Sequence, residues 1–529
     1  MSDPVRALHD SIAAAVAAMT GGEVPDLALE RPASADHGDY ATSVAMRLAP
    51  ILGRNPREIG EALSGAVGAL PGVASAEVAG PGFVNLRLDD GWYRDALSDI
   101  LAAGPDFGRR PVAPGDETLV EFVSSNPTGD LTIGSARNAA YGDSVARLIA
   151  FTGGRVTREY YVNDAGNQVQ LFGASARARR RGEEVPEGGY PGPEVAEIAA
   201  ALPLGDDAPL EDWVEQGVAA MLERIRASLA RMRVEFDLWT SERGLHDSGA
   251  VAAAIAHARA EGRVFEQDGA VWLRTTDFGD DKDRVLVKAD GEHTYFASDL
   301  AYIDHKFERG ATRAIYVLGA DHHGYVQRLR AAAACLGRDP EAVEILIYQL
   351  ITVSGERMGK RRGNVITLDE LVEAIGVDAS RYFLVQRSHD QTLDIDLDLA
   401  TEASSKNPVY YVQYAHARCA SILRKAADEG LAVDGVGARH APEPVERALL
   451  RRLAEWPEQV ALAADQRAPH RMAAWAHELA GDFHAFHHDA HVLHEDAEVR
   501  AFRLSLVRAT QEALARALGL IGVTAPDRM

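Results

Sequence analysis

Residues 118–143 read TLVEFVSSNPTGDLTIGSARNAAYGD. The apolar run at the start of this stretch predicts a strand, the polar segment SSNPTG predicts a turn, and helix-spaced apolar residues from Ile133 onward predict a helix. Thr132, Gly134 and Ser135 then fall in the first helical turn, where free backbone N–H groups point outward. A strand, a turn and a helix N-terminus in this order are typical of a site that binds nucleotide phosphate.

Strands and helices alternate from this stretch to about residue 388, with further β-branched runs at 155–162, 285–288, 314–318 and 345–353. This alternation predicts a Rossmann-like parallel sheet that is covered by helices on both faces. Between about 167 and 279 the pattern becomes helical and irregular, so we expect an insertion there. We place the α/β domain that contains this sheet at 116–395.

A smaller unit is expected on each side of this domain. Residues 1–105 combine helices with short strands and predict a small α/β domain, which a Pro- and Gly-rich linker separates from residue 116. After residue 398, alanine- and leucine-rich helical periods at 409–423, 445–463 and 502–520 predict an all-α bundle over 396–529. The result is a multidomain α/β protein, in line with the roughly two to four domains that a chain of this length forms.

Composition excludes several classes of protein. With 47% apolar and 25% charged residues, the chain contains no run near the ~20 apolar residues that a membrane span requires. The alanine-rich stretch 5–19 has acidic neighbours where a secretion signal has positive charge. Cys335 and Cys419 lie far apart without a CxxC spacing, so neither a disulfide framework nor a protein-bound zinc is predicted. These features favour the reducing cytoplasm.

The formal net charge is −24, from 55 basic and 79 acidic side chains. This charge argues against indiscriminate binding to nucleic acid, because phosphate contacts need clustered Lys and Arg. A specific RNA partner stays compatible, since basic clusters occur at 177–181 and 357–362. The first cluster is typical of a solvated helix face. The second lies in the glycine-containing loop 354–364, which is either a solvated basic turn or a loop that closes over a triphosphate and later releases pyrophosphate.

Together, the stretch 118–143 and the loop 354–364 resemble the two signature motifs of class I aminoacyl-tRNA synthetases, and the surrounding sequence resembles arginyl-tRNA synthetases. The resemblance covers nearly the whole chain, through EYYVNDAG at 159–166, FGDDKDR at 278–284, GADHHGY at 319–325 and NPVYYVQYAHAR at 407–418. It implies that ATP, with Mg²⁺, activates L-arginine to arginyl-adenylate, and that arginine is then transferred to tRNA(Arg) in translation. We expect a cytoplasmic monomer, with the catalytic domain at 116–395, a tRNA-contacting N-terminal domain and an anticodon-binding helical domain.

Both signatures depart from the family pattern. Thr132 and Ser135 stand where the HIGH motif has its two histidines. A hydroxyl is a neutral donor, and it forms a hydrogen bond roughly half as strong as that of a cationic histidine. Thr132 also has a structural alternative, because it occupies the position of a helix N-cap.

The KMSK motif differs as well. Arg357 and Gly359 replace its first lysine and its serine, while Met358 and Lys360 remain. We hypothesise that the arginines of this loop supply the positive charge that the missing histidines would have provided.

The resemblance implies roles for four sets of residues. The catalytic set is Thr132, Gly134, Ser135, Arg357, Lys360 and Arg361. The arginine-binding set is Glu121, Asn126, Tyr295 and Asp299. The ATP-binding set is Pro127, Thr128, Gly129, Gly319, Asp321, His322 and Met358. The tRNA-binding set is Tyr410, Tyr414 and Arg418.

The chemistry of guanidinium recognition supports two members of the arginine-binding set, apart from the family resemblance. A planar guanidinium is best recognised by carboxylates, with an aromatic hydroxyl beside them. Tyr295 and Asp299 are four residues apart at a predicted strand-to-helix junction and suit this need. Taken alone, an aspartate at a helix start is more often an N-cap. With the resemblance, contact with substrate becomes the better hypothesis.

No metal site is predicted. Histidines recur at helical spacing at His484, His487, His488, His491 and His494. We interpret them as a solvated helix face, because a closed metal site needs ligands that converge in a fixed geometry. Two alternatives to the main hypothesis stay open: a paralogue that activates arginine or an analogue for a non-ribosomal pathway, and a catalytically inactive tRNA-binding regulator.

Overall fold

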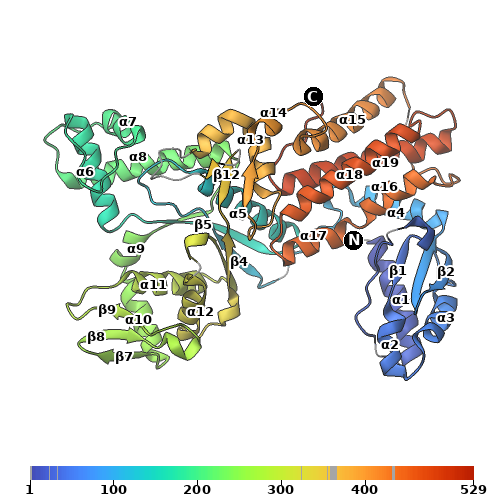
Figure 1. The fold of residues 1–529 in the computed structure, drawn as a ribbon, viewed down its shortest axis with the longest axis horizontal. Helices are drawn as coiled ribbons and strands as arrows, with labels where there is room; N and C mark the ends of the chain where they lie inside the picture. The colour runs from blue at the N-terminus through green and yellow to red at the C-terminus, as the bar shows by residue number, and fades with distance from the viewer. Residues whose placement is uncertain are drawn as a thin grey trace.

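The computed structural model describes residues 3–22, 24–32, 34–112, 114–322, 324–353, 356–357, 366–431 and 435–529. Figure 1 shows an elongated molecule. A small N-terminal unit and the C-terminal helices lie at one end of the molecule. The segments 167–231 and 242–308 lie at the other end. None of the helices in the described part of the chain has both the length and the apolar character that crossing a bilayer requires.

A five-stranded parallel sheet forms the centre of the molecule. Its strands run in the order β11 (Val343–Tyr348), β10 (Arg313–Gly319), β4 (Glu117–Glu121), β5 (Arg155–Val162) and β6 (Leu238–Ser241), and each neighbouring pair is parallel. The strand order reverses between β4 and β10. Open α/β sheets bind ligands at the carboxyl ends of the strands at such a point. The predicted sheet is therefore confirmed, and its topology indicates where a site belongs.

Helix α5 (Ile133–Phe151) follows β4 and is buried along most of its length. It packs against β5, β10, α13 (Leu368–Val385) and α17 (Trp456–Asp465). Close approach is possible because Gly142 has no side chain: a Cβ there would lie 2.4 Å from Cγ of Phe122, just after β4. The glycine thus lets the helix lie directly on the turn that precedes it.

The interval 167–279 does not form a single insertion. Helices α6 (Asn167–Arg181), α7 (Pro193–Ala201) and α8 (Leu210–Arg231) pack together, but the chain then returns to the central sheet as β6, parallel to β5. With only four residues, β6 is too short to show a strand periodicity. Helices α9 (Glu242–Asp247) and α10 (Ala250–Ala260) then lead to β7 (Val264–Gln267) and β8 (Ala270–Leu273).

Two predicted strands belong to other sheets. The run 285–288 forms β9 (Arg284–Val287), which pairs antiparallel with β8 in the sheet β7-β8-β9. The run 345–353 divides into β11 and β12 (Ile351–Val353), because the Gln349 N–H donates to the His389 carbonyl, at 2.8 Å, instead of continuing the ladder. Strand β12 pairs with β13 (Glu356–Arg357) and β14 (Leu393–Ile395). Helices α11 (Tyr295–Glu308) and α12 (Tyr325–Cys335) follow β9 and β10.

The N-terminal unit is a small α/β fold, as predicted. It contains α1 (Pro4–Thr20), β1 (Tyr40–Thr42), α2 (Val44–Leu52), α3 (Pro56–Val67), β2 (Val73–Ala79), β3 (Phe83–Leu88) and α4 (Asp90–Ala103), with short 3₁₀ turns at Ala35–His37 and Gly104–Asp106. The three strands form an antiparallel sheet in the order β1-β3-β2. Helix α4 packs against helices of the C-terminal bundle and so connects the two units.

The C-terminal part is the predicted helical bundle. It consists of α14 (Leu397–Thr401), α15 (Pro408–Asp428), α16 (Pro444–Ala454), α17, α18 (His470–Asp489) and α19 (Ala497–Leu520), and Figure 1 shows α18 and α19 side by side. The predicted helix 445–463 is two helices, α16 and α17. The break precedes Pro457, which lies in the first turn of α17 and has no backbone N–H to continue the hydrogen bonds of α16.

We expect Gly142→Ala to destabilise the protein by about 1–3 kcal/mol, because the added methyl group overlaps the Phe122 ring in a closely packed region. The thermal unfolding midpoint measures this effect. Gly519→Ala in α19 is the control, since nothing lies within 4 Å of the position of its Cβ and alanine favours a helix. A Gly142→Ala protein that unfolds at the wild-type temperature would contradict this account of how α5 packs.

Candidate active site

The turn between β4 and α5 has an unusual backbone that buried hydrogen bonds hold in place. Val123 and Ser124 have φ angles of 68° and 40°, which are uncommon for residues other than glycine. The Val123 N–H donates to Oδ1 of Asn138 in α5 at 3.0 Å, and Nδ2 of Asn138 donates to the Val317 carbonyl in β10 at 2.9 Å. One buried amide therefore connects the turn, α5 and β10, and fixes the carboxyl ends of the two central strands.

Three hydroxyl groups lie together at the start of α5. Thr132 is the N-cap, and its Oγ1 accepts from the Ser135 N–H at 3.4 Å. Oγ of Ser135 lies 3.4 Å from Oγ1 of Thr132 and 3.0 Å from Oγ of Ser125 in the preceding turn. Gly134 lies between them in the first helical turn. Thr132 and Ser135, the two residues predicted to stand at the HIGH histidine positions, therefore present neutral hydroxyls beside the free N–H groups and partial positive charge of a helix N-terminus.

The residues that follow the basic loop, from Ile366 onward, lie beside the start of α5. The Ile133 N–H donates to the Ile366 carbonyl at 3.0 Å, and the Leu368 N–H donates to the Leu131 carbonyl at 2.8 Å. Thr132 and Thr367 form an isolated antiparallel bridge. The chain that leaves the basic loop thus runs directly beside the start of α5.

Some predicted residues lie outside the described part of the chain. These are Met358, Lys360 and Arg361, together with the side chains of Asp321 and Arg357. For Arg357, only its backbone in β13 is described.

The described members of the predicted ATP-binding set lie around the same strand ends. Pro127 and Thr128 are buried in the β4–α5 turn, where the Thr128 N–H donates to the Asn126 carbonyl at 2.8 Å. Gly129 follows, near the start of α7. Gly319 ends β10 opposite Tyr348, and the His322 ring lies 5.5 Å from the Tyr325 ring. The β10 residues and the turn thus flank one edge of the sheet.

Beside these strand ends lies a row of acidic side chains. Glu121 in β4 and Glu159 in β5 are partners in the parallel register, so both side chains point to the face that α11 covers. Nζ of Lys306 in α11 lies between them, 2.8 Å from Oε2 of Glu121 and 2.7 Å from Oε2 of Glu159. Arg309 adds a second ion pair to Glu159 at 2.7 Å. Burial alone raises the pKa of Glu159, but Lys306, Thr240 and Arg309 outweigh it, and the pKa falls to about 2.

In the part of the chain that the structure describes, Asp299 has no ion pair or hydrogen bond of the kind that offsets the burial of Glu159. Its carboxylate accepts no hydrogen bond from another residue in the described ranges. Burial, followed by repulsion from Glu121 and Glu242, raises the pKa of Asp299 to about 7, although the positive charge of Arg328 opposes this shift. A half-buried carboxyl group without a partner, beside a fixed glutamate, is an arrangement that suits a cationic ligand.

The remaining predicted arginine-binding residues border this acidic group. Tyr295, at the first position of α11, is 75% exposed. Its hydroxyl lies near Gly166, where a Cβ would be 3.4 Å away. The Asn126 side chain is exposed at the β4–α5 turn. Tyr295, Asp299 and Glu121 thus come from two elements that meet at one edge of the sheet.

Sequence reasoning missed Lys306, Glu159 and Arg309. A signal was present, because Tyr295, Asp299, Tyr302 and Lys306 follow the i, i+4, i+7, i+11 spacing of one helical face. The partnership with Glu159 was not visible in the sequence, since it depends on the register between β4 and β5.

The predicted tRNA-binding residues lie along one face of α15. Tyr410 and Tyr414 are stacked with ring centroids 6.2 Å apart, and Tyr414 is 44% exposed. Nε of Arg418 donates to Nε2 of His487 in α18 at 3.2 Å, and the His484 ring stacks on Tyr414 at 5.9 Å. Within the described ranges, no group of three or more His, Cys, Asp or Glu side chains is placed to hold a metal ion.

The basic cluster at 177–181 mostly has intramolecular partners. Arg180 donates to the Ala199 carbonyl at 3.1 Å, and Nε of Arg181 donates to the Asp206 carbonyl at 2.7 Å. Arg179 donates to the Pro191 carbonyl. These arginines hold the segments around α7 against α6.

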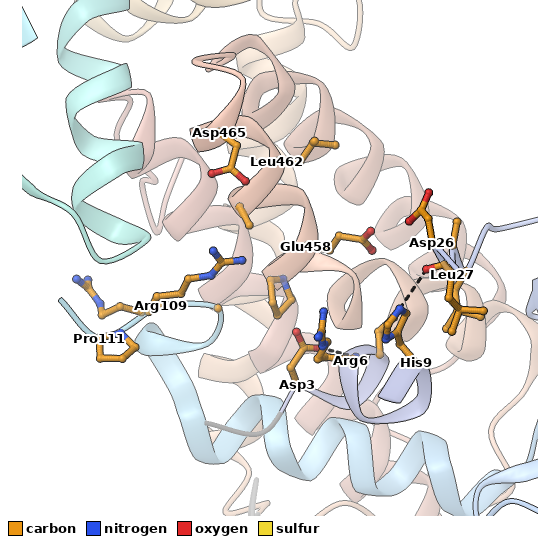
Figure 2. Close-up of a pocket in the computed structure, with 17 residues that line it drawn as sticks. Asp3, Arg6, His9, Asp26, Leu27, Arg109, Pro111, Glu458, Leu462 and Asp465 are labelled. Carbon is orange, nitrogen blue, oxygen red and sulfur yellow. Dashed lines mark hydrogen bonds between the residues drawn. The ribbon is translucent and has the colours of Figure 1, made fainter. Parts of the chain in front are cut away.

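A cavity of about 630 Å³ opens between α1, the segment 108–111 and α17. Figure 2 shows its lining side chains, with His9 bonded to the Leu27 carbonyl at 3.1 Å. Two of its lining arginines have ion-pair partners: Arg6 pairs with Asp10 at 2.9 Å and Arg109 with Asp106 at 2.7 Å. None of the predicted site residues lines this cavity, so we assign it no ligand.

Three family models match consecutive parts of the chain. Residues 6–88 match the arginyl tRNA synthetase N terminal domain, residues 208–420 match the catalytic domain of class I (R) tRNA synthetases, and residues 412–529 match the DALR anticodon binding domain. The catalytic model does not reach the β4–α5 turn.

Full-length relatives agree with these matches. The chain is 48% identical to an arginine–tRNA ligase of Frankia alni, over 99% of this chain and 99% of that protein. Among solved structures, a putative arginyl-tRNA synthetase from Campylobacter jejuni is 30% identical with a TM-score of 0.76, over 84% of this chain and 100% of that one. Thermus thermophilus arginyl-tRNA synthetase, 24% identical, shares the fold with a TM-score of 0.81 over 99% and 100% of the two chains.

We expect Asp299→Asn to raise the thermal unfolding midpoint of the free protein at pH 8. In the native state the pKa of Asp299 is raised to about 7, so ionisation of this group above its unfolded pKa opposes folding. The asparagine removes a penalty on the order of 4 kcal/mol at pH 8. The gain should shrink as the pH falls toward 4, where the carboxyl group is protonated in the native state and about half protonated in the unfolded state, whose pKa is about 3.9. A midpoint difference that does not change between pH 4.5 and pH 8 would contradict the assigned titration.

Proposed function

Since the chain belongs to the arginyl-tRNA synthetase family, we propose that it joins L-arginine to tRNA(Arg) at the expense of ATP. The observation that carries this proposal is the full-length identity to an arginine–tRNA ligase. The acidic site beside the α5 N-terminus supports it, because a guanidinium group needs carboxylates and a triphosphate needs N–H donors.

The reaction has two steps. A carboxylate oxygen of arginine attacks the α-phosphorus of ATP, the bond to the β-phosphate bridging oxygen breaks, and pyrophosphate leaves. The terminal ribose hydroxyl of tRNA then attacks the carbonyl of arginyl-adenylate, loses its proton, and AMP leaves with the bonding electrons. No protein nucleophile is required. Catalysis by this chain therefore consists of positioning and of stabilising charge on phosphate.

We assign the arginine side chain to Asp299 and Glu121 of the acidic row. Asp299 would pair with the guanidinium, and ionisation of Asp299 near neutral pH is favoured once that cation arrives. Glu121 would present a second carboxylate whose position is already fixed, and Tyr295 and Asn126 are exposed at the rim of the same site. Two acidic partners from different elements give the planar guanidinium a defined orientation.

We assign ATP to the strand ends and the α5 N-terminus. Thr132, Gly134 and Ser135 would face the phosphates, and the turn 127–129 with Gly319, Asp321 and His322 would face the adenosine. Mg²⁺ would enter with ATP as part of the substrate, and we assign it no protein ligand.

The positive charge that stabilises the phosphates has to come from outside α5. Arg137 follows Ser135 by two residues in the sequence. It is fully buried and donates to the carbonyls of Gln349, Ser388 and Gln391 at 2.8 to 2.9 Å. It is therefore committed to the contact between α5 and neighbouring loops. This leaves Arg357, Lys360 and Arg361 as the proposed source, with Met358 against the nucleotide.

We place the anticodon on the exposed face of α15, where Tyr410, Tyr414 and Arg418 lie in a row. Aromatic rings on which splayed bases stack are a common mode of RNA recognition. The N-terminal unit would contact another part of the tRNA. We further propose that the enzyme is a cytoplasmic monomer.

The test is an aminoacylation assay with purified protein, ATP, labelled arginine, and either total tRNA or none. Labelled arginyl-tRNA that forms only with both ATP and tRNA supports the proposal. Arginine that is activated but transferred to another acceptor would favour the paralogue, and no arginyl-tRNA under any condition would overturn the proposed function.

We expect Arg357→Ala and Lys360→Ala each to lower kcat of arginine activation by about 10- to 100-fold, because a charge-assisted contact to phosphate is lost in the transition state. Arginine-dependent exchange of pyrophosphate into ATP, with tRNA present, measures this step. Arg177→Ala in the other basic cluster is the control and should retain wild-type kcat. Unchanged kcat in both loop variants would exclude the loop as the source of charge.

We expect Tyr414→Ala to raise KM for tRNA by about 5-fold or more, since stacking of one base contributes about 1–3 kcal/mol. KM for arginine should not change, because α15 lies apart from the acidic row. Tyr414→Phe keeps the ring and serves as the matched control. Equal KM values for tRNA in the alanine variant and the wild type would rule out stacking at this position.

A further inference from the structure

A fully buried ammonium group lies behind the proposed arginine pocket. Lys306 in α11 has no exposed side-chain surface, and its Nζ donates to Glu121 and Glu159 at 2.8 and 2.7 Å. The Tyr302 ring centroid lies 3.7 Å from the same nitrogen, close enough for a cation–π contact. The Tyr316 ring centroid lies 4.9 Å from it, so the partners of this ammonium are two carboxylates and two aromatic faces.

Such a cation is costly to bury, so its contacts need an explanation. Removing an ammonium group and two carboxylates from water costs several kcal/mol for each ion, and apolar side chains of similar size often give equal or greater stability. Stability alone therefore does not account for a lysine here. The alternative is that the lysine holds one of the two carboxylates in the orientation that ligand binding requires.

Both carboxylates are held at both oxygens, since Oε1 of Glu159 also accepts from Thr240 and Arg309, but Glu121 is the one whose charge acts on Asp299. Oε2 of Glu121 accepts from Lys306, and its Oε1 accepts from Oγ of Ser124 at 3.1 Å. Ser124 is in the left-handed backbone region at φ 40°, and its Oγ also accepts from the Tyr161 N–H at 3.1 Å. The Glu121 carboxylate consequently has a defined orientation before any ligand arrives.

We propose that Lys306 is a positioning residue for arginine recognition: it fixes the Glu121 carboxylate opposite Asp299, so that the guanidinium meets one carboxylate that is already oriented. This proposal rests on the proposed function. Asp299 and Lys306 lie on the same face of α11, seven residues apart. One helix thus presents both a carboxylate for the substrate and the cation that orients the second carboxylate.

The chain offers a matched comparison for a purely structural role. Arg381 is also fully buried, and it pairs with Asp143 at 2.5 Å and donates to the carbonyls of Met232 and Ile521 at 2.7 and 2.9 Å. None of these partners belongs to the acidic row. Arg381→Met therefore breaks an ion pair of similar burial away from the pocket.

The experiment compares steady-state kinetics of arginylation in Lys306→Met, Arg381→Met and the wild type. We expect Lys306→Met to raise KM for arginine about 10- to 100-fold, as for a lost contact to a charged group, while KM for ATP stays within about twofold. Arg381→Met should lower the unfolding midpoint and leave KM for arginine unchanged.

A second pair of variants covers the case in which Lys306→Met does not fold. Glu159→Gln keeps the pair between Lys306 and Glu121, and should retain the wild-type KM for arginine. The double variant Glu159→Gln, Lys306→Met buries one negative charge fewer than Lys306→Met, but leaves Glu121 without its ammonium partner, so KM for arginine should rise as above.

Two results would overturn the proposal. One is a wild-type KM for arginine in the double variant or in Lys306→Met, and the other is a rise in KM for arginine and ATP by the same factor. Failure of the wild-type protein to form arginyl-tRNA would instead overturn the proposed function, so the two failures are distinguishable.

Discussion

Helix α5 reaches the carboxyl end of β4 only because Gly142 leaves room for the Phe122 ring. This close contact brings Asn138 to the turn, where its amide bonds to Val123 and across to β10. It also places the first turn of α5 beside Ile366 and Leu368, where the chain returns from the basic loop. The β4–α5 turn, the end of β10 and the segment after the basic loop thus all depend on the packing of α5 against the turn that precedes it.

The second constraint is the distribution of charge along the strand ends. Parallel register puts Glu121 and Glu159 side by side, and a single lysine from α11 neutralises part of that charge. Asp299 remains without a partner among the described residues, with a raised pKa. The free protein therefore carries an unfavourable carboxyl group that a guanidinium ligand would relieve, a compromise between stability and binding that is common at functional sites.

The regular features of the sequence predicted the framework well. Periodicity identified β4, β5, β10, α5 and the terminal helices, because each is long enough to show its period. It failed for β6, which has four residues, and it could not tell that 285–288 pairs in an antiparallel sheet, because an apolar run looks the same in either pairing. For the site, motif resemblance predicted that Glu121 and Asp299 bind arginine. Lys306 was missed, since its role follows from contacts between α11 and two strands.

The central claim is that a pre-oriented Glu121 and an unpartnered Asp299 together recognise the guanidinium. A crystal structure of the protein with bound L-arginine tests it most directly. The account predicts guanidinium nitrogens within hydrogen-bond distance of both carboxylates, with the ion pair between Lys306 and Glu121 unchanged. A guanidinium that lies away from Asp299, or a Glu121 carboxylate that leaves Lys306 to reach the ligand, would contradict it.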